Sequence, residues 1–124
     1  MIDELEAALR DQLPLRIDEV AYHEPTATLV GHGWSLNATC AWRLTRGTLL
    51  ICSSGDPGPE AGLQELIGQE ITAVTRQACA GPAVDPAFHI TSNLFLEIFS
   101  DTDYDPWVMR LPGHTFVGLA SAPE

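Results

Sequence analysis

The strongest constraint on the fold is an alternation of apolar and polar side chains between residues 34 and 45. Every even position holds an apolar residue: Trp34, Leu36, Ala38, Cys40, Trp42 and Leu44. Most odd positions hold a polar one: Ser35, Asn37, Thr39, Arg43 and Thr45. Because successive side chains of a strand point to opposite faces of a sheet, the pattern predicts one long strand with one buried face.

The residues after this strand predict a β-hairpin. Arg46-Gly47 supplies a two-residue turn, and an apolar segment follows it. Counting outward from that turn places Leu44 opposite Leu49. In this register Cys52 lies on the other face from Cys40, so we expect no disulfide between them.

The rest of the chain predicts two helices and further strands. The helices are expected at 3–12 and 60–67, and the other strands at 15–22, 69–76, 84–90, 94–100 and 107–111. Residues 23–33 read as a loop with a short strand at 28–30, and the tail after Pro112 carries no clear pattern. We therefore predict a single α+β domain over residues 1–124, mainly antiparallel sheet with both helices on one face.

Two segments of the sequence resemble each other. Residues 6–20 align with residues 60–74 without a gap, and polar as well as apolar positions agree. The segments that follow also align, with Trp42 over Phe88. We infer pseudo-repeats at 3–54 and 57–112, each an α-β-β-β unit, that must share one core. The alternative is that two amphipathic helix–strand units look alike because they obey the same physics.

Charge excludes several classes of function. The chain carries 17 acidic residues against six arginines and has no lysine, for a net charge of -11. That balance excludes a nucleic-acid binder that neutralises phosphates, and a polybasic membrane anchor. The acids lie in residues 1–24 and 56–124, whereas residues 25–55 hold none. An acidic surface attracts basic proteins, although the same charge also serves solubility alone.

Asp101, Asp103 and Asp105 alternate like the start of a calcium-binding loop. Such a loop needs glycine at its sixth place and glutamate at its twelfth, and those places hold Pro106 and Pro112. We therefore expect no tight calcium site. The three aspartates become a candidate contact for a basic partner, or else an ordinary solvated loop.

Two further residues are candidates for a binding site. Glu97 lies between Phe95 and Phe99 on one face of its strand, where an aromatic environment suits a general acid or base. The plainer interpretation is a solvent-side carboxylate. His32 lies between two glycines and is expected to be exposed, whereas His89 is expected to be a structural residue of the sheet. No histidine spacing is typical of zinc, so we predict neither metal nor cofactor.

The N-terminus and the cysteines bear on location. The first residues are acidic where a signal peptide is basic, and no apolar run is long enough to span a membrane. The three cysteines are an odd number without a C-x-x-C motif. We expect a cytoplasmic protein with reduced thiols, of which Cys79 is the most accessible.

Three motifs carry a resemblance to known sequences. They are L-x-x-L-I-G-x-x-I-x-x-V from Leu63, L-x-L-x-I-F-x-D from Leu94 and D-x-W-x-x-x-L-P from Asp105. Together they resemble small uncharacterised bacterial domains of unknown function, some of whose relatives are immunity-type proteins. The resemblance implies a bacterial origin and assigns no functional residue.

These observations favour a non-enzymatic protein-binding domain, in its sharper form an acidic immunity-type protein for a basic partner. The binding residues would be Asp101, Asp103, Asp105, His32 and Glu97. The alternative is a small-molecule-binding domain or minor enzyme that uses Glu97 and a histidine in a cleft between the two halves. The sequence is compatible with a monomer or a homodimer.

Overall fold

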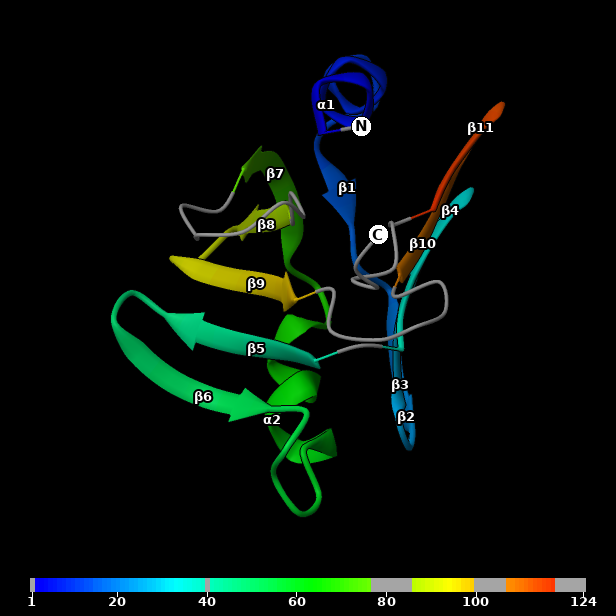
Figure 1. The fold of residues 1–124 in the computed structure, drawn as a ribbon. Coiled ribbons are helices and arrows are strands. Elements are labelled where there is room, and N and C mark those ends of the chain that lie inside the picture. The colour runs from blue at the N-terminus through cyan, green and yellow to red at the C-terminus, as the bar shows by residue number, and fades with distance from the viewer. Residues whose placement is uncertain (1, 40, 77–85, 100–106, 118–124) are drawn as a thin grey trace, which may run out of the picture.

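Two antiparallel β-sheets face each other across one apolar core (Figure 1). The structure is a computed structural model that describes residues 2–39, 41–76, 86–99 and 107–117. Sheet A contains, in spatial order, β1 (Leu15–Arg16), β7 (Glu70–Arg76), β8 (Pro86–Ile90), β9 (Leu94–Phe99), β5 (Ala41–Arg46) and β6 (Leu49–Ser53). Sheet B contains β11 (His114–Val117), β10 (Trp107–Leu111), β4 (Trp34–Ala38), β3 (Thr26–Gly31) and β2 (Glu19–His23).

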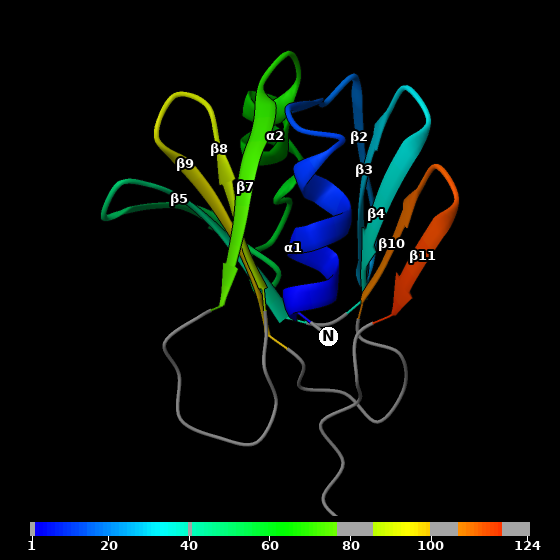
Figure 2. The ribbon, with the colours of Figure 1, turned by 90° about the horizontal axis from the view of Figure 1, so that it is seen from above.

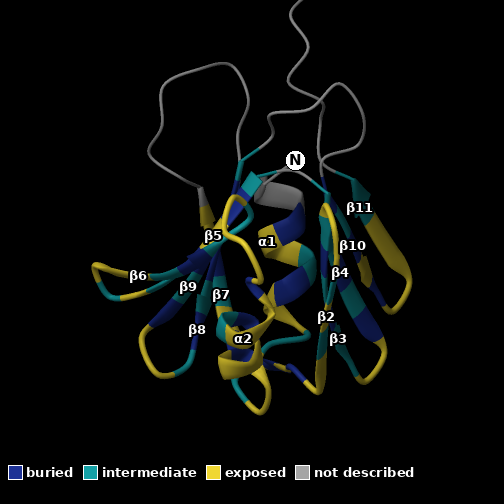
Figure 3. Ribbon diagram, turned by 90° about the horizontal axis from the view of Figure 1, so that it is seen from below, coloured by how far each residue is buried: buried dark blue, intermediate teal, exposed yellow. Residues whose placement is uncertain are grey.

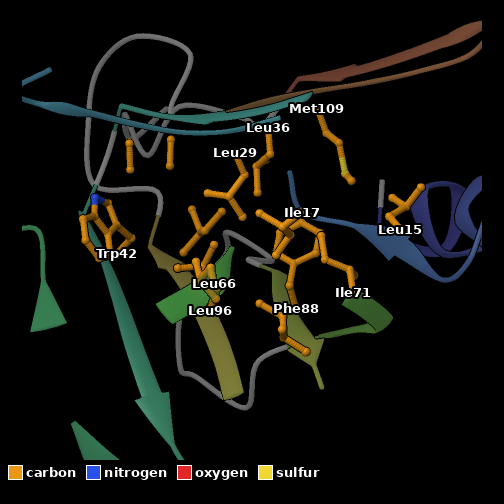
Figure 4. Close-up of a cluster of buried hydrophobic side chains, with 14 of the residues drawn as sticks. Leu15, Ile17, Leu29, Leu36, Trp42, Leu66, Ile71, Phe88, Leu96 and Met109 are labelled. Atoms are coloured by element: carbon orange, nitrogen blue, oxygen red, sulfur yellow. The ribbon is translucent and has the colours of Figure 1, made fainter. Parts of the chain in front are cut away.

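The inner faces of both sheets supply the core. Figure 4 shows Leu29, Leu36 and Met109 of sheet B pointing toward Phe88 and Leu96 of sheet A. All five side chains are buried. The apolar positions of the strands therefore face one shared interior, which is the arrangement that alternating strands require.

The helices lie between the two sheets rather than outside them (Figures 2 and 3). Helix α1 (Ile2–Arg10) contacts β7 and buries Leu5 and Leu9 completely. Helix α2 (Glu60–Leu63) continues as a 3₁₀ turn, η1 (Gln64–Leu66), and contacts both β2 and β6. Both helices pack on the inner face of sheet A, α1 against β7 and α2 against β6, and α2 also contacts β2 of sheet B, the sheet that the sequence did not predict as a separate layer.

The predicted fold class is confirmed in part. The protein is mostly antiparallel sheet with two short helices, so it is largely β rather than a clear α+β fold. The predicted helices at 3–12 and 60–67 are present but shorter, and the strand predicted at 15–22 is divided into β1 and β2.

The long alternating segment is two strands instead of one. Residues of β4 bury Trp34 and Leu36 in sheet B, and residues of β5 bury Trp42 and Leu44 in sheet A. The chain crosses from one sheet to the other between these strands. The alternation continues through the crossing because both sheets face the same core.

The hairpin of β5 and β6 exists, but its predicted register was wrong. Leu49 lies opposite Arg46 instead of Leu44, and a β-bulge between Leu44 and Thr45 shifts the later pairs. The bulge brings Cys52 opposite Leu44, on the buried face. Cys52 is a free, buried thiol, while Cys40 and Cys79 lie outside the described residues.

Two strands were not predicted at full length. The segment read mainly as a loop contains β3, in which Ala27 and Leu29 are buried between half-buried polar and β-branched neighbours. The tail contains β11, which follows a turn at Pro112–Gly113. Gly113 has φ +79°, a backbone conformation that glycine adopts without steric cost.

The two halves of the chain have a similar order of elements, and each half contributes strands to both sheets. In each half a helix precedes three strands that form a meander: β2-β3-β4 in sheet B and β7-β8-β9 in sheet A. The next two strands form a hairpin that joins the other half's meander. Thus β5-β6 extends sheet A beside β9, and β10-β11 extends sheet B beside β4.

The strand registers repeat this equivalence. Trp42 of β5 lies opposite Ile98 of β9, and Trp107 of β10 lies opposite Ala38 of β4. Both tryptophans are fully buried. Among the described residues, their Nε1 atoms are the buried side-chain polar atoms that have no hydrogen-bond partner. In the structure Trp42 lies on β5 and Phe88 on β8, whereas Trp42 and Trp107 both lie on the strand that joins the meander of the other half.

The first strand pair also fits the repeat. Arg16 lies opposite Glu70 in the β1–β7 ladder, and these residues occupy the same position in the alignment of 6–20 with 60–74. An antiparallel pair centred on equivalent residues has a local twofold axis between them. Each half of the chain therefore contains more than an α-β-β-β unit, namely a helix followed by five or more strands.

Candidate functional site

The sequence-predicted site residues do not gather in one place. Asp101, Asp103 and Asp105 lie outside the described residues. His32 is exposed in the turn between β3 and β4 of sheet B, whereas Glu97 lies on β9 of sheet A. The structure therefore separates His32 from Glu97.

Glu97 lies on the outer face of sheet A, as its alternation with buried neighbours predicted. Arg43 of the adjacent strand β5 lies directly opposite Glu97, and its Nε donates a hydrogen bond of 2.5 Å to Oε1 of Glu97. The guanidinium group also lies over the ring of Phe99, 5.3 Å from its centroid. The hydrogen bond and the charge of Glu97 raise the pKa of Arg43.

This pairing bears on the chemistry of Glu97. The carboxylate of Glu97 accepts a charge-assisted hydrogen bond from Arg43, so one of its oxygens is already engaged. The sequence did not identify Arg43, because nothing in it aligns β5 with β9. The one available signal was its place on the polar side of the alternating segment.

His89 is a structural residue of the same face. Its Nε2 lies 2.9 Å from Oγ1 of Thr75 on β7, and its ring meets Phe95 edge to face with centroids 5.0 Å apart. Both contacts are cross-strand contacts within sheet A. The prediction of a sheet histidine with its polar group satisfied is confirmed.

An open groove of about 540 Å³ lies on this outer face. Its apolar sides are Leu50 of β6 and Phe95 of β9, and the Arg43–Glu97 ion pair forms part of its lining. The remaining lining residues are Thr45, Gly47 and Thr48. Strands β5 and β6 come from the first half of the chain and β9 from the second, so the groove lies where the halves meet. It contains no histidine.

Strand β6 borders this groove and is the last strand of sheet A. Its side chains Leu49 and Leu50 are 66% and 54% exposed. An exposed edge strand without charged residues is a surface to which another strand can bind. The far end of β6 is capped, since the Ser53 amide donates to Oδ2 of Asp56 at 2.9 Å and the Ser53 carbonyl accepts from the Asp56 amide at 3.1 Å.

Exposed carboxylates surround α2 between the two edge strands β2 and β6. Burial raises the pKa of Tyr22 on β2, and the charges of Glu24 and Glu60 add to this effect. On the other side of α2, burial raises the pKa of the Cys52 thiol to about 11, with smaller contributions from Asp56 and Glu65. We call Glu24, Asp56, Glu60 and Glu65 the α2 carboxylates; all four residues are exposed.

One arginine offsets part of this charge. Arg46 donates to Oε1 of Glu65 at 2.7 Å, and both side chains are more than 40% exposed. Three of the α2 carboxylates have no arginine ion pair within the described part of the chain. The surface around α2 is therefore a source of negative potential next to the apolar edge of β6.

Two features are absent from the residues that the structure describes. No group of three or more histidine, cysteine, aspartate or glutamate side chains is placed to hold a metal ion. None of the helices in this part of the chain has the length and apolar character needed to cross a membrane.

The chain was compared with known proteins. No family model, no curated protein and no solved structure matches it.

Proposed function

We propose that the protein is a non-enzymatic protein-binding domain whose partner is a basic protein. The observation that carries this proposal is the group of α2 carboxylates, exposed between two sheet edges in a chain with a net charge of -11. Such a surface raises the rate at which cationic surfaces arrive and orients them before contact.

The proposal is tested by binding kinetics. The purified chain is used to capture partners from its native host, and association with the captured protein is measured at about 50 and 300 mM salt. We expect the association rate to fall at high salt and to fall again when Glu24 and Glu60 are changed to glutamine. The matched control replaces Glu6 and Asp11 of the α1 region, which are also exposed, with their amides. A rate indifferent to salt and to E24Q/E60Q would contradict the proposal.

The sharper form of this proposal is an immunity-type protein of a cytoplasmic bacterial system. It follows from the resemblance in the three sequence motifs and from the acidic surface. Its test is genetic. A toxin-like reading frame beside the gene, whose product is neutralised by co-expression of this chain, would support it. A neighbouring toxin that remains lethal in the presence of the chain would contradict it.

One observation favours a second function, the binding of a small molecule. The groove lined by Glu97, Arg43 and Phe95 lies where the two halves meet, as the alternative interpretation required of a cleft. A catalytic form of this function is weakened, since no histidine lines the groove and Glu97 is paired with Arg43. Saturable binding of a small molecule that is lost in Glu97→Gln and unchanged in Glu24→Gln would support it.

We also propose that the chain arose by duplication of one unit. The same element order, the corresponding tryptophans and the Arg16–Glu70 pair support this origin. In the ancestral homodimer each subunit would have given its hairpin to the sheet of the other, as each half does now.

A further inference from the structure

We propose that the free edge of β6 is the docking site for an extended segment of the partner, which adds to sheet A as a seventh strand. This inference rests on the proposed function and deepens it by naming the contact surface and the chemistry of the docked segment. The occupant we infer is a strand in which apolar and basic residues alternate.

The first observation is that no other described segment covers the edge of β6. It is the outermost strand of a six-stranded sheet, and the sequence Leu49–Ser53 contains no charge and no proline. Soluble proteins commonly protect such edges with lysine, proline or a covering loop. Here Asp56 caps only the Ser53 end, and among the described residues no strand pairs with the outer side of β6 at Leu49, Leu50 and Ile51.

The second observation is that the two faces beside this edge differ in chemistry. Leu50 borders the groove on the outer face, where Phe95 supplies a further apolar wall. Leu49 lies opposite Arg46, whose side chain reaches Glu65 on the inner side, where α2 contacts β6. Because side chains of an added strand alternate between the faces, apolar residues would lie beside Leu50 and basic residues toward Glu65.

The negative charge near β6 favours a positively charged segment as the added strand. Asp56 accepts a hydrogen bond from the Ser53 amide at one end of β6, and at the other end Glu65 is paired with Arg46, which lies opposite Leu49, so two carboxylates flank the strand. The chain as a whole is strongly acidic. An acidic strand would therefore be repelled, and so would a second copy of this chain at long range.

The equivalent strand of the other half offers an internal control. Strand β11 is the outermost strand of sheet B, and Thr115 occupies in it the position that Leu50 occupies in β6, since both follow the first residue after a two-residue turn. Thr115 is exposed and polar. The substitutions Leu50→Lys and Thr115→Lys therefore add the same positive charge, one at the edge of sheet A and the other at the edge of sheet B.

The experiment uses the full chain and a synthetic peptide of about ten residues that alternates valine and arginine, with blocked ends. Backbone amide hydrogen exchange is followed by NMR with and without the peptide. We expect protection of the Leu50 amide, because the pair Arg46–Leu49 closes the turn and the next N–H of β6 points away from β5. Methylation of alternate peptide nitrogens, which removes the donors of one edge, should weaken binding by about tenfold or more. Leu50→Lys should weaken it by about tenfold, and Thr115→Lys by less than about twofold.

Three results would overturn strand addition. One is that the methylated and unmethylated peptides bind equally well and that hydrogen exchange changes only at α2. The proposal of a basic partner would then stand, but strand addition at β6 would be wrong. Another is concentration-dependent protection of β6 without peptide, which would identify a second copy as the occupant. The third is equal weakening by Leu50→Lys and Thr115→Lys. The proposed function fails separately, if association with the natural partner is indifferent to salt and to E24Q/E60Q.

Discussion

Arg43 and Glu97 are separated by 54 residues of chain, yet β5 and β9 bring their side chains together on the outer face of sheet A. Arg43 is half exposed, so the ion pair contributes only about 0–1 kcal/mol to stability. The ion pair matters more for the chemistry of the groove, because Arg43 engages the Glu97 carboxylate, which the sequence suggested as a general acid or base. The pair instead gives the groove two fixed polar groups beside Leu50 and Phe95.

Cys52 should make stability depend on pH in the alkaline range. Its pKa is raised to about 11 in the folded protein from an ordinary value of 9.0, so the folded state holds the proton more tightly than the unfolded state. The free energy of unfolding should therefore fall as the pH rises from about 9 to about 11, by at most about 1.4 kcal/mol per pH unit.

The measurement is denaturant unfolding of the wild type and of Cys52→Ala at several pH values. The variant should lose part of this alkaline decline, and the remainder belongs to other groups such as Tyr22, whose pKa is also raised. Identical pH profiles for the two proteins would show that Cys52 is not the titrating group. Below pH 9 the difference in the free energy of unfolding between the wild type and Cys52→Ala should not change with pH.

The candidate site could be predicted only one strand at a time. The alternation of Phe95, Glu97 and Phe99 correctly gave the outer face of β9, because alternation is a local property. The partner of Glu97 could not be predicted, since it depends on the register between strands from different halves. The groove could not be predicted from the sequence either, because its lining residues come from three strands and a turn.

Helix α2 is held against β6 by a close approach that only glycine permits. A Cβ atom added at Gly62 would lie 2.6 Å from Sγ and 2.9 Å from Cβ of Cys52. Contacts this short force the helix and the strand apart. This position therefore sets the distance between α2 and the inner face of the hairpin β5–β6.

Gly62→Ala should destabilise the protein by about 1–3 kcal/mol, because overpacking a buried contact displaces its neighbours. The displacement should be greatest at β6, so hydrogen exchange at Cys52 should accelerate more than exchange in sheet B. Gly55→Ala is the control, since a Cβ atom there would meet nothing within 4 Å. Equal melting temperatures for the two variants would contradict this account of the helix–strand contact.

At the level of elements, the sequence predicted which face of a strand is buried better than which sheet the strand joins. Residues 34–44 show one unbroken alternation, yet the structure divides them between β4 and β5. Periodicity reports burial, and both sheets bury their residues in the same core. The hairpin register failed for a related reason, because the bulge between Leu44 and Thr45 has no sequence signature of its own.

Each sheet contains strands from both halves of the molecule. Sheet A joins β5 and β6 to the meander of the second half, and sheet B joins β10 and β11 to that of the first. Neither half can complete a sheet by itself, and each leaves the edge of its own meander uncovered. The core is therefore a property of the whole chain, in agreement with the predicted need for one shared core.

A chain cut within the turn residues 54–59 should consequently reassemble. We expect each fragment alone to lack cooperative unfolding, because its hairpin and its meander belong to different sheets. An equimolar mixture should recover the circular dichroism spectrum and a cooperative melt of the intact chain. A cut inside β8 serves as the control, because it divides a meander and should prevent recovery. A first fragment that melts cooperatively by itself would refute the interleaved account.

The interleaving also has a consequence for synthesis on the ribosome. Strand β5 has β9 as its neighbour, and β4 has β10, so the first half emerges long before its partners exist. During that interval Trp42 and Leu36 have no opposing strands to cover them, and two strand edges stay open to other nascent chains. Folding must wait for the last strands, which makes it slow for a protein of this size. We expect the nascent chain to bind holdase chaperones until β10 has left the exit tunnel.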